Sequence, residues 1–466
     1  MRNETSALQW LWTVLILLLT ICVCILPMGN LPLWNGEKPA HRNQYELMAE
    51  AILDGRISFD YGDEDTLSGL QNPYDPDERK EAGVYYHWDH AYYNGTYYMY
   101  FGIVPVFLTF LPYRVLTGQA LTTYHATQIF VAVAIVGIFV LFGMLRKLFF
   151  KKMPLYLYLA LSAAFSVMSV WYSSAEPALY CTAITAAICL EVWSLYFFIR
   201  AVWQEERENK QILFAAIGAL LGALVFGCRP PIGLANIVVL PCLYVFLRQR
   251  KFSWKLLGKL CLAALPYALV AAALMTYNYV RFDDPFEFGQ AYQLTVADQS
   301  NYKVTLDGAN LLRVYNNTVK NFFAFSDQTA TFPYVKTSSV FANFPVLLLG
   351  LWLFQPAVWR RAAQHRLLPF FCGLVVAVLV ITAFDILWTP YLLERYRMDI
   401  YFLMGIGCFP IIGLGLETAP RKKLTAGFLT ACATVTLVAA WLMYVRTVGV
   451  YYPDRVTEIG QLLGLS

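Results

Sequence analysis

Charged residues are scarce in this chain. Asp, Glu, Lys and Arg make up 14% of its 466 residues and hydrophobic residues make up 58%, whereas about a quarter of a typical globular domain is charged. The apolar residues are concentrated in blocks of about 20, the length that crosses a hydrocarbon core. These features exclude a soluble globular domain and indicate a helical protein that crosses a membrane many times.

Cysteine is absent from the two longest polar segments. All ten cysteines fall in or at the ends of apolar blocks, which excludes a disulfide framework in the polar segments. No spacing of cysteine and histidine is typical of a zinc site. The sequence also contains no internal repeat of useful strength, which argues against a transporter built from inverted repeats.

Eleven apolar blocks are predicted to span the membrane. They cover residues 8–27, 122–145, 154–171, 178–199, 212–228, 231–247, 260–279, 341–358, 368–388, 398–417 and 425–446. The first block is too long for a signal-peptide core and has no small-residue cleavage site, so we expect it to remain as an anchor. The expected fold class is therefore all-α and polytopic, with a single membrane domain over residues 1–466.

Basic residues are nearly absent from every second short loop. The other short loops carry basic clusters at 146–152, 248–255, 360–366 and 421–423. The positive-inside rule places these clusters in the cytoplasm, the N-terminus inside and the C-terminus outside, in an inner (plasma) membrane. Two long segments, 28–121 and 280–340, then lie outside. Such an asymmetry favours an enzyme that works on the outer face.

Two helices are predicted within the first long segment. The stretch NQYELMAEAILDG places most of its apolar residues on one helical face before Gly55, which is typical of a helix that lies on a membrane surface. The stretch FGIVPVFLTFLPYRVLTG is apolar but is interrupted by Pro105 and Pro112. It is too short and kinked to span the membrane, so we expect a second interfacial helix.

This arrangement resembles the GT-C class of membrane glycosyltransferases, and most closely its protein O-mannosyltransferase and lipid A aminoarabinose-transferase-like families. The resemblance rests on the two stretches above, on WYSSAEPALYCTAITAA, on ERYRMDIYFLMGIG and on the count of eleven spans. It implies inverting transfer of a sugar from a polyprenyl-phosphate donor to an acceptor glycan, lipid or protein. It also implies a loop carboxylate as base and cations that hold the lipid phosphate. The Asp-Glu pair of these families would fall near residues 41–43, where this chain reads HRN.

The nearest acids, Glu37 and Asp89, are therefore the candidate catalytic bases. A solvated or turn position remains the alternative for both. The stretch WDHAYYNGTYYMYFGIVP, residues 88–105, surrounds Asp89 with aromatic rings. We expect Trp88 and Tyr93 to contact the sugar, although membrane-interface belts are also rich in these residues.

His87 and His90 flank the same aspartate and are predicted to hydrogen bond to substrate. With His41 they could instead hold a divalent cation, and the acidic stretches 63–65 and 75–77 have the Asp-x-Asp pattern of nucleotide-sugar enzymes. Nucleotide sugars are cytoplasmic and this segment is predicted to be outside, so a solvated acidic loop is favoured. No cofactor is expected.

Four arginines are candidates for binding the lipid phosphate: Arg229, Arg281, Arg395 and Arg397. All four are predicted to lie near the outer membrane surface, where a lone cation is costly without a partner. A lipid phosphate or Glu176 could pair with Arg229. For each arginine, snorkelling or pairing with a nearby acid is the alternative.

Two other classes of function remain open, and neither they nor the enzyme would bind nucleic acid. Glu176, Glu191 and Asp385 are acids within or beside apolar blocks, as in a transporter or flippase of lipid-linked sugar. A non-catalytic GT-C relative would explain the missing Asp-Glu pair. The two large outer segments favour the enzyme.

Overall fold

The computed structural model describes residues 2–25, 43–300, 305, 307–325, 329–388, 393–451 and 453–465. Within these ranges, ten helical segments are long and apolar enough to cross a membrane. They are α1 (Arg2–Ile25), α5 (Thr123–Phe149), α6 (Leu155–Ala175), α7 (Leu179–Trp203), α8 (Glu208–Phe226), the continuous run of α9 (Pro230–Gly233), η3 (Leu234–Val238) and α10 (Val239–Arg248), α11 (Trp254–Phe282), α15 (Leu368–Trp388), η5 (Glu394–Arg397) with α16 (Met398–Thr418), and α17 (Lys422–Tyr451). The chain is a polytopic helical membrane protein, and ten of the eleven predicted spans are confirmed as long helices.

The predicted span at 341–358 is not a single helix. It is divided into α13 (Val340–Asn343), the 3₁₀-helix η4 (Pro345–Phe354) and α14 (Pro356–Gln364). Each of the two later pieces begins at a proline, which lacks the N–H that a continuing helix would need. The pieces nevertheless extend alongside α16, because Asn343 contacts Tyr401 and the carbonyl of Val346 contacts Cys408.

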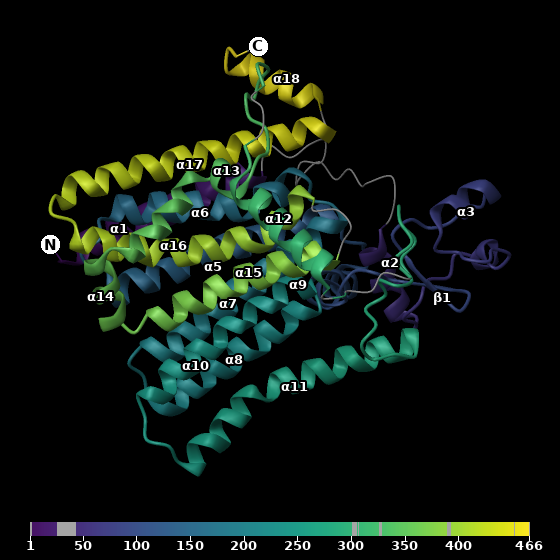
Figure 1. Ribbon diagram of the computed structural model, residues 1–466, viewed down its shortest axis with the longest axis horizontal. Coiled ribbons are helices and arrows are strands. Elements are labelled where there is room, and N and C mark those ends of the chain that lie inside the picture. Colours follow the sequence, from purple (N-terminus) through teal and green to yellow (C-terminus); the bar gives the residue numbers. More distant parts are fainter. Residues whose placement is uncertain are drawn as a thin grey trace.

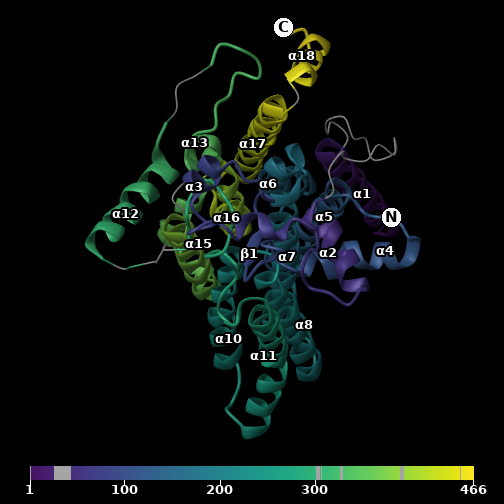
Figure 2. The ribbon, with the colours of Figure 1, turned by 90° about the vertical axis from the view of Figure 1, so that its right-hand side faces the viewer.

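Figure 1 shows the polar segments and the turns with basic clusters at opposite ends of the bundle. The elements α2 (Gln44–Leu53), α3 (Pro76–Ala82) and β1 (Ala91–Tyr93) lie at one end, while α14 and the turn between α10 and α11 lie at the other. Seen from the polar end, β1 and α2 lie in the middle of the bundle and α12 (Gly308–Phe323) lies at its periphery (Figure 2). A final helix, α18, covers Pro453–Leu462.

The all-α prediction omitted one small sheet. Strand β1 pairs antiparallel with β2 (Thr96–Tyr98) through a turn at Asn94 and Gly95. Both turn residues have positive φ, 50° and 77°, as a two-residue hairpin of the Asn-Gly type requires. The turn signal is present in the sequence as YYNGTYY.

Each of the two stretches of the first long segment that were predicted to be helical forms a helix. The first is α2, which begins after Asn43, whose side chain accepts a hydrogen bond from the backbone N–H of Tyr45. The second is the π-helical turn η2 (Val106–Phe110) continued by α4 (Leu111–Thr117). Helix α2 packs its apolar face on η2, with the rings of Tyr45 and Phe110 stacked 5.2 Å apart. A short 3₁₀-helix, η1, covers Glu64–Leu67.

The two long polar segments meet beside the hairpin. Ala91 forms an isolated antiparallel bridge with Gln293, and the backbone N–H of Asp89 donates to the carbonyl of Leu294 at 2.9 Å. Leu294 is fully buried in a hydrophobic cluster that also contains Tyr45 and Tyr97. The start of the second long segment therefore holds the first in place. Asp89 and Gln293, from the two sides of this junction, line the cavity that is described below.

Candidate functional site

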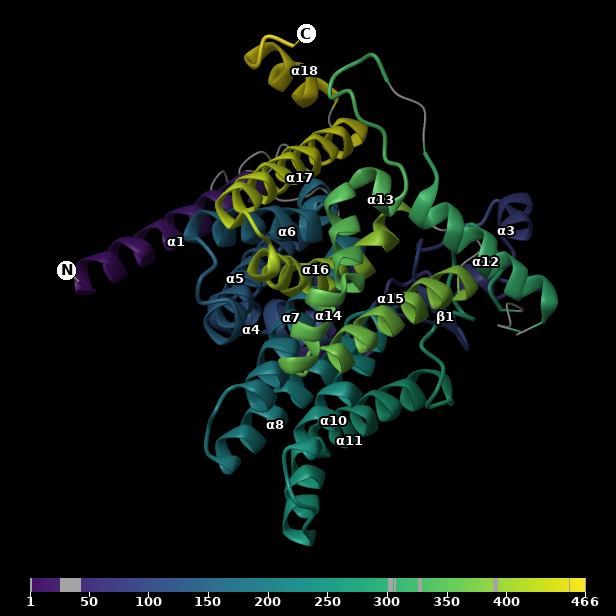
Figure 3. The ribbon, with the colours of Figure 1, turned by 60° about the vertical axis from the view of Figure 1, so that its left-hand side comes forward.

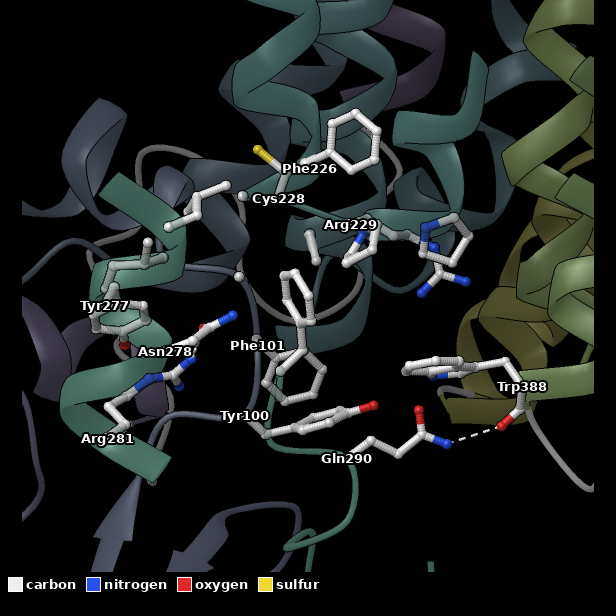
Figure 4. A pocket seen from close by; sticks show the side chains of 18 of the residues that line it. Tyr100, Phe101, Phe226, Cys228, Arg229, Tyr277, Asn278, Arg281, Gln290 and Trp388 are labelled. Carbon is white, nitrogen blue, oxygen red and sulfur yellow. Dashed lines mark hydrogen bonds between the residues drawn. The ribbon is translucent and has the colours of Figure 1, made fainter. Parts of the chain in front are cut away.

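Two adjacent cavities lie where the polar segments meet the ends of the membrane helices. The Asp89 cavity has a volume of about 280 Å³ and its polar lining includes Asp89, Tyr180, Gln293 and Arg395. The Trp388 cavity has a volume of about 130 Å³ and is drawn in Figure 4. Five residues line both cavities: Tyr100, Phe101, Ala183, Arg229 and Tyr396. The cavities therefore share a wall, and one ligand could extend from one to the other.

Asp89 is fixed in the wall of its cavity. Its backbone has a φ of 58°, a left-handed conformation that aspartate tolerates better than most residues. Its Oδ1 accepts a hydrogen bond from Gln293 Nε2 at 2.8 Å, and its Oδ2 accepts one from the hydroxyl of Tyr180. Burial raises the pKa of Asp89, and the hydrogen bond from Tyr180 and the positive charge of Arg395 partly oppose this rise. A carboxylate with a raised pKa is a stronger base than a solvated aspartate.

Gln44, the first residue of α2, aligns the loop that carries Asp89. Its Nε2 donates to the backbone carbonyl of Asp89 at 2.8 Å, and its Oε1 accepts from the backbone N–H of Tyr100 at 3.0 Å. Gln44 is buried. A single side chain thus connects the start of α2 with the backbone at Asp89 and at Tyr100.

Arg395 is a cation of the Asp89 cavity that forms no ion pair in the described part of the chain. Its guanidinium lies 4.2 Å from the ring centroid of Tyr180, which itself donates to Asp89. Within the described part of the chain, Arg395 forms no ion pair with a carboxylate. A half-buried guanidinium in a cavity wall can bind an anion with two parallel hydrogen bonds.

Arg229 is neutralised by an acid, Asp399. Its Nε lies 2.8 Å and 3.0 Å from the two carboxylate oxygens of Asp399, and a terminal nitrogen lies 2.7 Å from one of them. Asp399 is fully buried. Asp385 also lines the Trp388 cavity and interacts electrostatically with this pair. Arg229 therefore brings little net charge to a ligand.

Arg281 lines the Trp388 cavity, and its two terminal nitrogens donate to protein groups, whereas its buried Nε has no hydrogen-bond partner among the described residues. It donates to the carbonyl of Met99 and to the side chain of Asn278, both at 2.7 Å. Its guanidinium also lies 3.8 Å from the ring centroid of Tyr277. Apolar side chains complete this cavity, among them Trp388, whose carbonyl accepts a hydrogen bond from Gln290 Nε2 at 2.9 Å (Figure 4).

Of the two aromatic residues that were predicted to contact the sugar, Trp88 lines the Asp89 cavity and Tyr93 does not. Trp88 is 47% exposed, so its ring is free to stack on a ligand at the rim. Tyr93 lies outside the linings of both cavities, donates to Asp283 at 3.2 Å and packs on Tyr292.

Three more predicted residues lie outside both cavity linings. His87 pairs with Asp63 at 3.1 Å, and Arg397 donates to Asn321 at 2.9 Å. His90 is buried behind the loop. Each of the three side chains is held by protein groups instead of facing a ligand space, so we do not carry them into the proposed mechanism.

Glu37 and His41 lie outside the described residues. Among the residues that the structure does describe, no group of three or more His, Cys, Asp or Glu side chains could hold a metal ion. The acidic stretch 63–65 instead supplies the partner of His87, and Asp75 caps α3 by accepting from the backbone N–H of Asp77.

Three contributors to the site had no signal in the sequence. Gln293 lies 204 residues from Asp89 along the chain. Gln44 and Tyr180 lie in stretches that carry the family resemblance, but neither residue has a feature of its own that points to the site. The Arg229–Asp399 pair could in principle have been predicted from the sequence, because an arginine and an acid at apolar helix ends each need a partner.

Burial of His90 makes the stability of the polar end depend on pH. Its imidazole donates to the carbonyl of Trp88 and accepts from Tyr61, and burial lowers the pKa of His90 to about 4. The unfolded chain binds a proton near the ordinary value of about 6.5, so the contribution of His90 is complete above that pH and is lost as the pH falls towards 4. We expect a loss on the order of 3 kcal/mol over this window. Thermal unfolding at pH 7 and pH 4.5 should therefore show a weaker pH dependence for His90→Gln than for the wild type; equal dependence would contradict this assignment.

Comparison with known proteins gives a likeness of fold. No protein-family model and no curated protein matches the chain. Among solved structures, the chain is similar to the apo oligosaccharyltransferase of Archaeoglobus fulgidus, with a TM-score of 0.49, 14% identity, and coverage of 94% of this chain and 56% of that one. It is similar to ArnT from Cupriavidus metallidurans bound to undecaprenyl phosphate, with a TM-score of 0.44, 13% identity, and coverage of 94% and 75%.

A second structure of the archaeal oligosaccharyltransferase, tethered to an acceptor peptide, has a TM-score of 0.41 and 15% identity, and the chain covers 55% of it. The chain thus spans about half the length of the archaeal protein. These proteins fall within the class that the sequence resembles. The activity proposed below rests on the residues of this chain.

Proposed function

We propose that this protein transfers a sugar from a polyprenyl-phosphate donor to an acceptor on the outer face of the membrane. The observation that carries the proposal is the composition of the Asp89 cavity. A carboxylate with a raised pKa and a guanidinium without an ion-pair partner line the same cavity, which adjoins a second cavity whose lining combines apolar side chains such as Trp388 and Phe226 with polar ones. A lipid-linked sugar phosphate has the matching parts in the same order: acceptor-facing sugar, anionic phosphate and apolar chain.

In the proposed reaction, the carboxylate of Asp89 takes the proton of an acceptor hydroxyl. The acceptor oxygen bonds to the anomeric carbon as the bond from that carbon to the phosphate oxygen breaks, and the configuration inverts. Polyprenyl phosphate leaves with the electron pair of the broken bond, and the guanidinium of Arg395 stabilises its growing negative charge. The proton on Asp89 is released to water afterwards.

The shared wall of the two cavities supports the placement of the donor. The first isoprene units would lie against Trp388 and Phe226, and the sugar would lie near Trp88 and Tyr100. Because Arg229 is neutralised by Asp399, we assign phosphate binding mainly to Arg395. Arg281 and Arg229 then shape the wall and keep it polar.

The test is a transfer assay with the full chain in liposomes. The donor is a panel of polyprenyl-phosphate hexoses and pentoses, and the acceptor is a membrane extract. Under the proposal, at least one donor is converted to polyprenyl phosphate and its sugar appears on an acceptor. Donor binding without turnover would indicate a non-catalytic protein, and movement of intact donor across the bilayer would indicate a flippase; either result would overturn the proposal.

Arg395 and Arg397 offer a matched pair of variants. They lie two residues apart, but only Arg395 lines the Asp89 cavity. We expect Arg395→Gln to lower the rate of transfer on the order of 10²-fold, since it removes the cation that stabilises the leaving phosphate. Arg397→Gln should change the rate less than about threefold. Equal losses in the two variants, measured as initial rates at saturating acceptor, would remove the specific role of Arg395.

A further inference from the structure

A large groove opens between α1 and the bundle, far from the Asp89 cavity. It has a volume of about 760 Å³ and lies between α1 and helices α5, α6 and α7. The C-terminal half of α1 packs closely, with Thr20 and Cys24 buried, whereas Trp10 is 68% exposed. Figure 3 shows the N-terminal end of α1 projecting from the bundle. The divergence of α1 from its neighbours creates this α1 groove.

One stretch of the α1 groove has apolar walls on both sides. Val14 and Leu17 of α1 face Phe139, Val140 and Met144 of α5. Both helices are long and apolar enough to cross a membrane, so these walls lie at the level of the hydrocarbon core. A water-soluble ligand would not enter such a space, whereas an acyl chain would fill it.

One end of the α1 groove is basic. Its lining includes Arg146 and Lys147 from the last turn of α5 and Arg200 from the last turn of α7, and it includes no acidic residue. Arg200 lies 3.8 Å from Glu206, outside the lining. Within the described part of the chain, Arg146 and Lys147 form no ion pair with a carboxylate. The groove therefore has an excess of positive charge at the point where its apolar walls end.

We propose that the α1 groove binds an anionic phospholipid. The part of an acyl chain nearest the headgroup would lie between α1 and α5, and the phosphate of the headgroup would lie beside Lys147 and Arg146. The distribution of charge supports this assignment, because a basic pocket between membrane helices at the end of an apolar groove is complementary to an anionic lipid. The bound lipid would fill the space beside α1 and hold the N-terminal half of that helix against the bundle. This site is independent of the proposed sugar transfer.

Native mass spectrometry of the purified full chain tests the assignment. The protein is incubated with equimolar phosphatidylglycerol and phosphatidylcholine, and the retained lipids are counted. We expect the wild type to retain one phosphatidylglycerol in preference to phosphatidylcholine. Lys147→Gln should weaken this retention about fivefold, the effect of removing one basic residue near an anionic headgroup. Val14→Trp, which fills the groove, should abolish it.

The matched control is Lys251→Gln. Lys251 is an exposed lysine in the turn between α10 and α11, and it does not line the groove. An equal loss in the Lys147 and Lys251 variants would mean that the lipid responds only to net charge, and this would overturn the site. Equal retention of the two phospholipids by the wild type would also overturn it. So would preferential retention of polyprenyl phosphate in a three-way competition. None of these results would alter the transfer measured with the wild type and the Asp89 variant.

Discussion

Asp89→Asn should lower the rate of sugar transfer by about 10²- to 10⁴-fold, the usual contribution of a general base. The asparagine side chain has nearly the same shape and tolerates the φ of 58° at this position. It cannot take a proton from an acceptor hydroxyl. Because burial raises the pKa of Asp89, the ionised carboxylate is held at a cost to folding at neutral pH, and the neutral variant should be at least as stable as the wild type. Initial transfer rates and thermal unfolding of the same preparation check both expectations.

Asp283→Asn is the matched control for this substitution. Asp283 also has a positive φ, 57°, and accepts a hydrogen bond from Tyr93, but it lies outside both cavity linings. The control should keep the wild-type rate within about threefold.

For the wild type, the rate should fall at acidic pH with a midpoint above the ordinary aspartate value of about 3.9, since protonated Asp89 cannot act as a base. Full activity of Asp89→Asn would remove Asp89 from the role of base.

Arg229→Gln should destabilise the fold by about 3–5 kcal/mol, the usual effect of breaking a buried ion pair. The substitution leaves Asp399 fully buried without its cation, close to the second acid Asp385. The expected result is a lower unfolding temperature in detergent at pH 7. The transfer rate per folded molecule should fall less than in Arg395→Gln, because Arg229 is already neutralised.

The double variant Arg229→Gln/Asp399→Asn separates charge from shape. It removes both members of the pair and leaves two neutral groups that can hydrogen bond, so it should recover more than half of the lost stability. If the double variant is less stable than the wild type by the sum of the losses measured for Arg229→Gln and Asp399→Asn alone, the pair does not act as a unit. The account of a neutralised Arg229 would then be wrong.

Hydropathy and charge patterns in the sequence locate most of the membrane helices. Ten of the eleven predicted spans match helices, because twenty consecutive apolar residues have few other stable arrangements. The failure at 341–358 has a local cause. A ten-residue apolar 3₁₀-helix begins at Pro345 and ends two residues before Pro356, and its length of about 20 Å is too short to cross the hydrocarbon core alone.

The candidate site was predictable only in part. The density of aromatic residues around Asp89 indicated the loop that lines the candidate site, and Arg395 was selected for its predicted place near the outer membrane surface. What the sequence could not show was contact between distant segments. Gln293 and Leu294 approach Asp89 only because the second long segment pairs with the hairpin, and no local pattern encodes that pairing. The direction of each side chain could not be predicted either. Arg395 and Arg397 lie two residues apart, but Arg395 lies over the ring of Tyr180 and Arg397 donates to Asn321.

A structure of the purified protein with a polyprenyl-phosphate analogue is the most direct test of the proposed function. The account predicts that the phosphate lies within ion-pair distance of Arg395, that the first isoprene units occupy the Trp388 cavity, and that the carboxylate of Asp89 faces the space beyond the phosphate. A phosphate bound elsewhere, with Asp89 still enclosed by Tyr180 and Gln293 and no ligand in either cavity, would contradict the assignment of this site to sugar transfer.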